Sequence, residues 1–162
     1  MKSIQSIPAK IFDRKEILIQ IARWRLKNKR IVFTNGVFDI IHEGHISSLS
    51  EAATFGDILI VAVNSDASVQ RLKGPSRPVN SEQARALVLA SMVVTDAIVV
   101  FEQDTPLDLI KAVMPDVLVK GGDYTVDQIA GAKQVLENGG EVKLAAIIPG
   151  VSTTAIIEKM KV

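Results

Sequence analysis

The stretch Ile31–His45, which reads IVFTNGVFDIIHEGH, decides the fold. Its opening run, Ile31–Thr34, is rich in β-branched and aromatic residues and predicts a buried strand. A turn of small residues follows, and two histidines, His42 and His45, then lie close to the start of a helix predicted over residues 44–55. Backbone N–H groups at such a turn and helix start can cradle phosphate. The order of these elements therefore predicts a parallel α/β sheet with a phosphate-binding turn.

Short apolar runs of the same kind recur along the chain and alternate with segments of helical length. The further predicted strands are Asp57–Val63, Ala97–Phe101, Val117–Lys120 and Val142–Ile147, and the further predicted helices span residues 66–72, 81–94, 105–113, 126–138 and 153–161. Most of the strand-like runs lack an alternation of polar and apolar residues, which is typical of strands buried on both faces. We predict an α/β, Rossmann-like open parallel sheet of about five strands with helices on both faces.

Composition limits the classes of protein that fit. The 162 residues fit one domain, 1–162, in which residues 1–28 are expected to form a helical extension packed on the rest. The net charge is only +1, so a surface that binds nucleic acid is not expected. The absence of cysteine excludes disulfides and thiolate metal sites. No apolar run is long enough to cross a membrane and no signal peptide is visible, so we expect a cytoplasmic location without membrane contact.

His42 and His45 are the only histidines in the chain, and their spacing puts both on one face of a helix. Gly44 between them removes a side chain that would block close approach of a ligand. Two ordinary core histidines are one alternative. A zinc site completed by Asp39 is another, although the spacing differs from that of a helical zinc hydrolase. We expect the pair to bind phosphate and expect no metal held by protein side chains.

The segment Thr34–His45 resembles the nucleotide-binding signature of the cytidylyltransferase-like nucleotidyltransferases, whose hallmark is His-x-Gly-His after a strand. The chain is most similar to the adenylyltransferase domain of bacterial heptose enzymes, from about Lys29 to Lys161. Four more blocks carry the resemblance, at Val63–Asp66, Leu72–Val79, Val117–Tyr124 and Gly150–Ile157. The chain departs from the family pattern in two places, of which the first, Val37, is expected to be neutral because a backbone N–H would make the nearby phosphate contact. Val37 stands where many relatives carry Cys, and apolar Ile147 and Ile148 stand near an Arg of the glycerol-phosphate cytidylyltransferases, which favours the heptose branch.

The resemblance implies a reaction in lipopolysaccharide biosynthesis. ATP and D-glycero-β-D-manno-heptose 1-phosphate would give ADP-heptose and pyrophosphate by in-line attack on the α-phosphorus. The implied cofactor is Mg²⁺, bound mainly through the triphosphate. A homodimer is expected, as in relatives, and a separate sugar kinase upstream, because these residues include no kinase domain. The alternatives are a CTP-dependent polyol-phosphate or glycerol-phosphate cytidylyltransferase and a nucleotide-binding module without turnover.

The resemblance and the chemistry of the side chains together indicate which residues act. The expected catalytic residues are His42, His45 and Lys73. The expected nucleotide-binding residues are Thr34, Asn35, Gly36, Val37, Phe38, His42, Gly44, His45, Arg85, Lys120, Gly122, Asp123, Ser152, Thr153 and Thr154. The expected residues for the sugar phosphate are Asp39, Asn64, Asp66, Arg77 and Tyr124.

Four of these residues also admit a purely structural role. Lys73 and Arg77 flank a loop with Gly and Pro residues that can close over a triphosphate, or they are solvated surface charges. Arg85 either binds phosphate through two nitrogens or forms a structural ion pair. Asp39 is expected to buttress the phosphate turn rather than to react.

Two later segments carry the same ambiguity. Lys120 and Asp123 border a Gly-Gly turn, where Lys120 can meet a phosphate and Asp123 a ribose or sugar hydroxyl, or the segment is a simple turn. Ser152–Thr154 opens the last predicted helix, where a helix cap and a phosphate contact are compatible.

Overall fold

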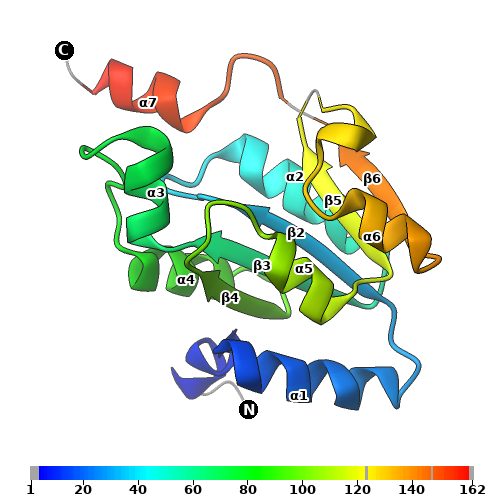
Figure 1. Cartoon of the computed structure of the whole chain (residues 1–162). Helices are drawn as coiled ribbons and strands as arrows, with labels where there is room; N and C mark the ends of the chain where they lie inside the picture. The colour runs from blue at the N-terminus through cyan, green and yellow to red at the C-terminus, as the bar shows by residue number, and fades with distance from the viewer. Residues whose placement is uncertain (1–3, 123, 147, 161–162) are drawn as a thin grey trace.

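The computed structural model describes residues 4–122, 124–146 and 148–160. In this part of the chain a six-stranded, fully parallel sheet has the order β1-β4-β3-β2-β5-β6 (Figure 1). The strands are β1 (Ile11–Phe12), β2 (Ile31–Gly36), β3 (Ile58–Asn64), β4 (Ala97–Phe101), β5 (Val117–Gly121) and β6 (Glu141–Ala145). The helices are α1 (Arg14–Arg25), α2 (Glu43–Ala53), α3 (Asp66–Lys73), α4 (Glu82–Ala90), α5 (Leu107–Val113), α6 (Ala132–Glu137) and α7 (Thr153–Lys159), with 3-10 turns η1 (Ile4–Ser6), η2 (Pro8–Lys10) and η3 (Val126–Gln128).

The predicted fold class is confirmed, and the structure differs from the prediction in two details. The sheet has a sixth strand, β1, which pairs Ile11 with Ile98 at the edge of β4. A strand of two residues carries too short a pattern to be recognised in the sequence. The helix predicted over residues 126–138 is divided into η3 and α6 because Gly131 adopts a left-handed conformation (φ 85°) that an α-helix cannot contain.

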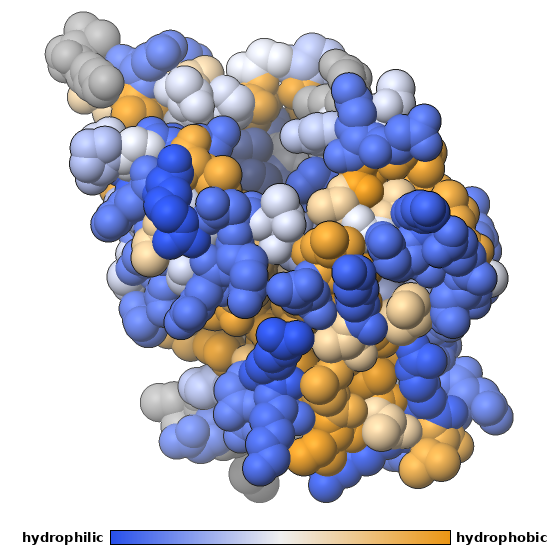
Figure 2. Space-filling model, viewed as in Figure 1, coloured by the Kyte–Doolittle hydropathy of each residue, from blue (hydrophilic) through white to orange (hydrophobic). Residues whose placement is uncertain are grey.

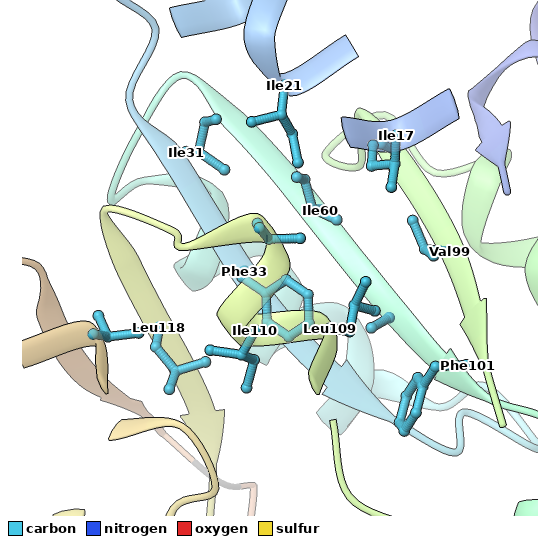
Figure 3. Close-up of a cluster of buried hydrophobic side chains, with 14 of the residues drawn as sticks. Ile17, Ile21, Ile31, Phe33, Ile60, Val99, Phe101, Leu109, Ile110 and Leu118 are labelled. Atoms are coloured by element: carbon cyan, nitrogen blue, oxygen red, sulfur yellow. The ribbon is translucent and has the colours of Figure 1, made fainter. Parts of the chain in front are cut away.

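One apolar layer lies between the sheet and α1, α5 and α6. Ile17 and Ile21 of α1 point toward the sheet, and Ile110 of α5 lies beside Phe33 (Figure 3). These four side chains are almost completely buried. A capping box starts α1, since the Asp13 side chain accepts from the Glu16 N–H at 2.8 Å while the Glu16 carboxylate accepts from the Asp13 N–H at 3.0 Å.

The second apolar layer covers the opposite face of the sheet. Leu49 of α2 and Leu89 of α4 pack there with Val32 and Val61 of the central strands. Both faces of these strands are therefore buried, which is the physical reason for their continuous apolar runs. In the described part of the chain, no helix combines the length and the apolar character needed to cross a membrane.

The order of the strands determines where a ligand binds. Strand β2 pairs with both β3 and β5, and the chain continues outward from it in both directions. Between β2 and β5 the direction of winding reverses, and open parallel sheets bind ligands at the carboxyl ends of the strands at such a point. The predicted phosphate turn after β2 lies at this position.

Candidate active site

The turn after β2 brings the two histidines together. Phe38 adopts a left-handed conformation (φ 50°) that redirects the chain, and α2 begins directly after His42. The carbonyl of His42 accepts hydrogen bonds from the N–H groups of His45 (3.0 Å) and Ile46 (3.2 Å), which starts the helix. The His42 side chain does not cap the helix, so its imidazole remains available to a ligand.

The two imidazoles are stacked face to face. Their ring centroids are 3.8 Å apart with an interplanar angle of 21°, and the ring of Phe38 meets His45 edge-on at 5.1 Å. The Nδ1 atoms of both histidines are buried and have no partner among the described residues. Because buried polar atoms in proteins nearly always have hydrogen-bond partners, this pair indicates a ligand site. A Cβ on Gly44 would lie 3.1 Å from the His42 ring, a tight contact that the glycine avoids.

Burial keeps the pair uncharged. Desolvation lowers the pKa of His45 to about 4, assisted by the neighbouring His42 and opposed by the Ile40 carbonyl. Desolvation also lowers the pKa of His42, against the raising effect of Glu43. Both imidazoles are therefore neutral near pH 7, and each carries one N–H and one unprotonated ring nitrogen. A bound polyphosphate would favour the protonated forms, because an opposite charge raises the pKa of histidine.

Two adjoining cavities lie at the carboxyl ends of the strands, where Figure 2 shows the surface hollowed near the top of the view. The larger cavity, of about 360 Å³, is lined by Asn35, Gly36, Val37, Asn64, Leu72, Lys73, Asp104, Thr105, Pro106, Lys120, Tyr124, Gln128, Ile129 and Ala130. The smaller, of about 170 Å³, is lined by Thr34, Asn35, Gly36, Phe38, His45, Ser48, Leu49, Val119, Lys120, Gly121 and Ala145. Asn35, Gly36 and Lys120 belong to both.

About half of the residues predicted for the site line these cavities, and His42 and Gly44 line neither. The smaller cavity contains His45, Thr34 and Phe38, and the larger contains Val37, Asn64, Lys73 and Tyr124, with Asn35, Gly36 and Lys120 shared. Gly122 follows the shared wall and has a φ of 122°, which requires glycine. Asp123 and Ile147 lie outside the described residues.

Arg85 is not at the surface of either cavity. It is almost fully buried, and its Nε, Nη1 and Nη2 atoms donate to the Asn80 carbonyl (3.0 Å), the Val37 carbonyl (2.7 Å) and the Asp66 carboxylate (2.8 Å). Of the two roles considered for Arg85, the structure shows the ion pair; its partner is Asp66, which was predicted for the sugar phosphate and lines neither cavity. Through the Val37 carbonyl, Arg85 holds the phosphate turn in place.

Asp39 and Arg77 form a second internal network beside the same turn. The Asp39 carboxylate accepts from Arg77 Nε at 2.6 Å and from the N–H groups of Val79 and Asn80 at 2.9 Å. Burial alone would raise the pKa of Asp39, but the two backbone donors and Arg77 outweigh it and keep the pKa below its usual value. Asp39 therefore buttresses the turn as expected, and Arg77 is tied to it instead of facing a cavity.

Two lysines supply the positive charge of the cavities. Lys73 is the last residue of α3 and lines the larger cavity. Lys120 belongs to the wall that the two cavities share. Burial lowers the pKa of Lys120, and its Nζ lies 5.6 Å from the centroid of the Tyr124 ring. Neither amine forms an ion pair with any residue that the structure describes, so both are available to an anion.

The start of α7 packs against the histidine loop. The Ser152 side chain accepts from the Ala155 N–H at 3.1 Å and caps the helix, as predicted. The Thr153 hydroxyl donates to the Ile40 carbonyl at 3.3 Å. Phosphate contacts from Ser152, Thr153 and Thr154 stay a prediction.

Four polar cavity residues were missed by the sequence analysis. Ser48 lines the smaller cavity, and Asp104, Thr105 and Gln128 line the larger. Thr105 follows a predicted strand and could have been found by its position, whereas Gln128 reaches the cavity only because η3 folds back over the sheet. No group of three His, Asp or Glu side chains in the described ranges is arranged to hold a metal ion.

Known proteins resemble this chain in sequence. A family model described as Cytidylyltransferase-like matches residues 33–159. The bifunctional protein HldE of Koribacter versatilis is 54% identical over 158 residues, which are 98% of this chain and 32% of that protein. The protein of the same name from Caulobacter vibrioides is 52% identical over 151 residues, which are 93% of this chain and 31% of that protein. The chain thus spans about a third of the length of these curated relatives.

Solved structures share the fold, and their likeness agrees with the family match. A lipopolysaccharide core biosynthesis protein from Thermoplasma volcanium has a TM-score of 0.59 at 29% identity, covering 74% of this chain and 97% of that one. A pantoate-β-alanine ligase from Francisella tularensis has a TM-score of 0.59 at 17% identity, covering 93% of this chain and 76% of that one, a likeness of fold alone. Because the family model matches most of its residues, the chain belongs to the cytidylyltransferase-like family of nucleotidyltransferases, as the resemblance in sequence predicts.

Proposed function

We propose that this chain transfers the adenylyl group of ATP to a heptose 1-phosphate and releases pyrophosphate. One observation carries the reaction class: two stacked, uncharged histidines with unpartnered, buried Nδ1 atoms beside the switch point of the sheet. The substrates are supported by the resemblance to the heptose adenylyltransferases and by the bifunctional HldE and lipopolysaccharide core biosynthesis proteins among the similar chains.

The reaction needs little from the protein in the way of proton transfer. The phosphate of the acceptor is mostly doubly ionised near pH 7, since the second pKa of a phosphate monoester is about 6. Its oxygen attacks the α-phosphorus, the bond from that phosphorus to the β-phosphate oxygen breaks, and pyrophosphate departs with the electron pair. Positioning and charge stabilisation then supply most of the rate enhancement.

The site residues fit these two tasks. In the proposed reaction His42 and His45 donate to phosphate oxygens as negative charge moves to the leaving group. Their lowered pKa in the free protein leaves both imidazoles neutral, and the negative charge of a bound polyphosphate would shift the pKa of each upward. Lys120 and Lys73 offset the repulsion between the two approaching phosphates.

Mg²⁺ is proposed to accompany the triphosphate instead of occupying a protein-built site. Asp104 is the carboxylate that lines the larger cavity among the described residues, and it accepts from Arg71 Nε at 2.7 Å. The donor set in the cavity is therefore mainly cationic and amide groups, which fits a metal held by phosphate oxygens. When bound, the ion would neutralise charge on the triphosphate.

The direct test is pyrophosphate release measured with ATP or CTP against heptose 1-phosphate, glycerol 3-phosphate and other sugar phosphates. We expect ATP with heptose 1-phosphate to be much faster than CTP with glycerol 3-phosphate. A hydrogen-bonding site can reject the wrong base by several powers of ten, about 10⁴ in well-built cases.

Each other result has a defined meaning. If CTP is faster than ATP with every acceptor, the heptose assignment is wrong and the cytidylyltransferase alternative replaces it. If ATP binds but no acceptor releases pyrophosphate, the chain is a nucleotide-binding module. The His42→Ala variant measures the background rate in each assay.

A further inference from the structure

The two cavities differ in which of the two substrates each can bind. They meet at a wall of three residues, Asn35, Gly36 and Lys120, and only the smaller one is lined by His45. In-line transfer requires the attacking oxygen and the departing pyrophosphate to lie on opposite sides of the α-phosphorus. If the triphosphate lies at the histidines, the larger cavity, across the shared wall, is open to the attacking molecule.

We propose that the larger cavity is the acceptor subsite and that Gln128 and Thr105 select the sugar there by hydrogen bonds to its hydroxyls. This assignment rests on the proposed function and adds the part of the site that recognises the sugar. Lys120, in the shared wall, lies where the acceptor phosphate meets the α-phosphate.

The charge of the larger cavity suits a phosphorylated molecule. Lys73 and Lys120 both line it, and neither is paired with a carboxylate among the described residues. The Asp104 carboxylate is already engaged by Arg71, at the cavity's edge. An incoming phosphate thus meets two free ammonium groups and one neutralised carboxylate.

The uncharged polar groups of the larger cavity suit a polyhydroxylated molecule. The Gln128 Oε1 accepts from the Thr125 N–H at 3.1 Å, which orients the amide and leaves both Nε2 hydrogens for a ligand. Asn64 uses Nδ2 on the Ser68 hydroxyl at 3.0 Å, so its Oδ1 is left to accept. Thr105 is exposed in the cavity and offers a hydroxyl that both donates and accepts.

The remaining surface of the cavity is partly apolar. Leu72, Pro106, Ile129 and the half-exposed Tyr124 ring contribute to its walls. Sugars present C–H surfaces beside their hydroxyls, and binding sites combine such walls with a few placed polar groups. The cavity therefore offers groups that can bind the phosphate, the hydroxyls and the C–H surfaces of a sugar phosphate. A nucleobase carries no negative charge and would not use the ammonium groups of Lys73 and Lys120.

The test uses Gln128→Glu with Gln134→Glu as its matched control. Glutamate keeps the acceptor oxygen that holds Thr125 but replaces the free donor with negative charge facing the acceptor phosphate. Gln134 lies on α6 and lines a separate groove, so its variant adds the same charge outside the site. We expect Gln128→Glu to raise KM for heptose 1-phosphate about tenfold or more, with ATP affinity in the absence of acceptor changed less than about twofold. Gln134→Glu should change neither.

A second variant removes one hydroxyl without adding charge. Thr105→Val preserves shape, and we expect it to raise KM for heptose 1-phosphate about fivefold or more through the lost hydrogen bond, again without loss of ATP affinity. If these variants weaken ATP binding instead, the larger cavity holds the nucleotide and the assignment is wrong. Unchanged KM for the sugar phosphate in both variants would also overturn it.

Calorimetry separates this assignment from the proposed reaction. Heptose 1-phosphate is titrated into each protein that has been saturated with a non-hydrolysable ATP analogue, so no turnover is needed. Weaker binding to Gln128→Glu than to Gln134→Glu supports the subsite even if the wild-type chain releases no pyrophosphate. Equal binding to the two variants contradicts the subsite even if the reaction is confirmed.

Discussion

Two regions flank the phosphate turn and treat their polar groups in opposite ways. On one side, both carboxylate oxygens of Asp39, the Nε of Arg77 and all three guanidinium nitrogens of Arg85 form hydrogen bonds within the chain. On the other side, the Nδ1 atoms of His42 and His45 are buried without a partner. The contrast distinguishes groups that stabilise the turn from groups that are left to bind a ligand.

The first region, Asp39, Arg77 and Arg85, holds the histidine pair in position. Arg85 donates to the Val37 carbonyl, and the Asp39 carboxylate accepts from the N–H groups of residues 79 and 80. These bonds fix the turn between β2 and α2 without using the histidines. Fully satisfied buried networks are rigid, and a rigid frame places donors where charge develops without reorganisation. The first region should therefore affect stability and the second activity.

The largest expected effect is the loss of turnover on removing either histidine. His42→Ala and His45→Ala should each lower turnover by about 100-fold or more, the loss typical of one preorganised donor. Because neither Nδ1 atom supports the fold, the melting temperature should stay close to that of the wild type. Steady-state pyrophosphate release and circular dichroism check both parts, and a variant with nearly normal turnover would contradict the division between the regions.

The second effect concerns the stability of the region formed by Asp39, Arg77 and Arg85. Asp39→Asn places an amide against Arg77 and two backbone donors, and we expect a loss of about 3 kcal/mol in the free energy of unfolding, typical of a buried ion pair that loses one member. Arg77→Met should lose less, because Asp39 keeps its bonds to Val79 and Asn80. Urea denaturation measures both variants. An equal loss in the two would show that the backbone bonds contribute nothing.

Gly44→Ala sharpens the comparison within α2. The added methyl group would lie 3.1 Å from the His42 ring and displace it, while alanine favours a helix more than glycine does. We expect turnover to fall about tenfold through misplacement of the donor, with no loss of thermal stability. Ser50→Ala on the same helix is the control, and equal activity in the two variants would refute the steric argument.

The smallest effect is a pH dependence of stability. The pKa of His45 is about 4 in the folded chain against 6.5 when unfolded, so acid favours the unfolded state. Its contribution is complete above the unfolded pKa and is lost as the pH falls toward the folded one. Between about pH 7 and pH 5 the wild-type melting temperature should fall more than that of His45→Gln. A parallel decrease in both would show that His45 titrates normally.

Local patterns were sufficient to predict much of the fold. Strands β2 to β5 carry apolar runs because both faces of the sheet are covered there, and the stretch Ile31–His45 carries its strand, turn and helix start together. The two histidines were predicted to lie together, and their rings do stack, but helix spacing is not the reason, because His42 is the extended residue before α2 and only His45 lies in the helix. These properties depend on neighbours in the sequence.

Other features depend on contacts between distant segments and could not be predicted. Arg85 and Asp66 are 19 residues apart, and nothing local indicates that they pair inside the chain instead of facing a phosphate. Lys120 belongs to the wall between the two cavities. Gln128 lines the larger cavity because of the position of η3 in the fold. Such placements follow from tertiary packing.

The most direct measurement of the central claim is nuclear magnetic resonance of the two imidazoles. The chain has only two histidines, so protein labelled with ¹⁵N-histidine gives a spectrum with two side chains to follow. The account predicts neutral imidazoles near pH 7 in the free protein, with Mg²⁺-ATP shifting their nitrogen resonances and raising their pKa. If calorimetry shows that ATP is bound while both imidazoles keep their resonances and their pKa, the histidines do not contact phosphate and the account is wrong.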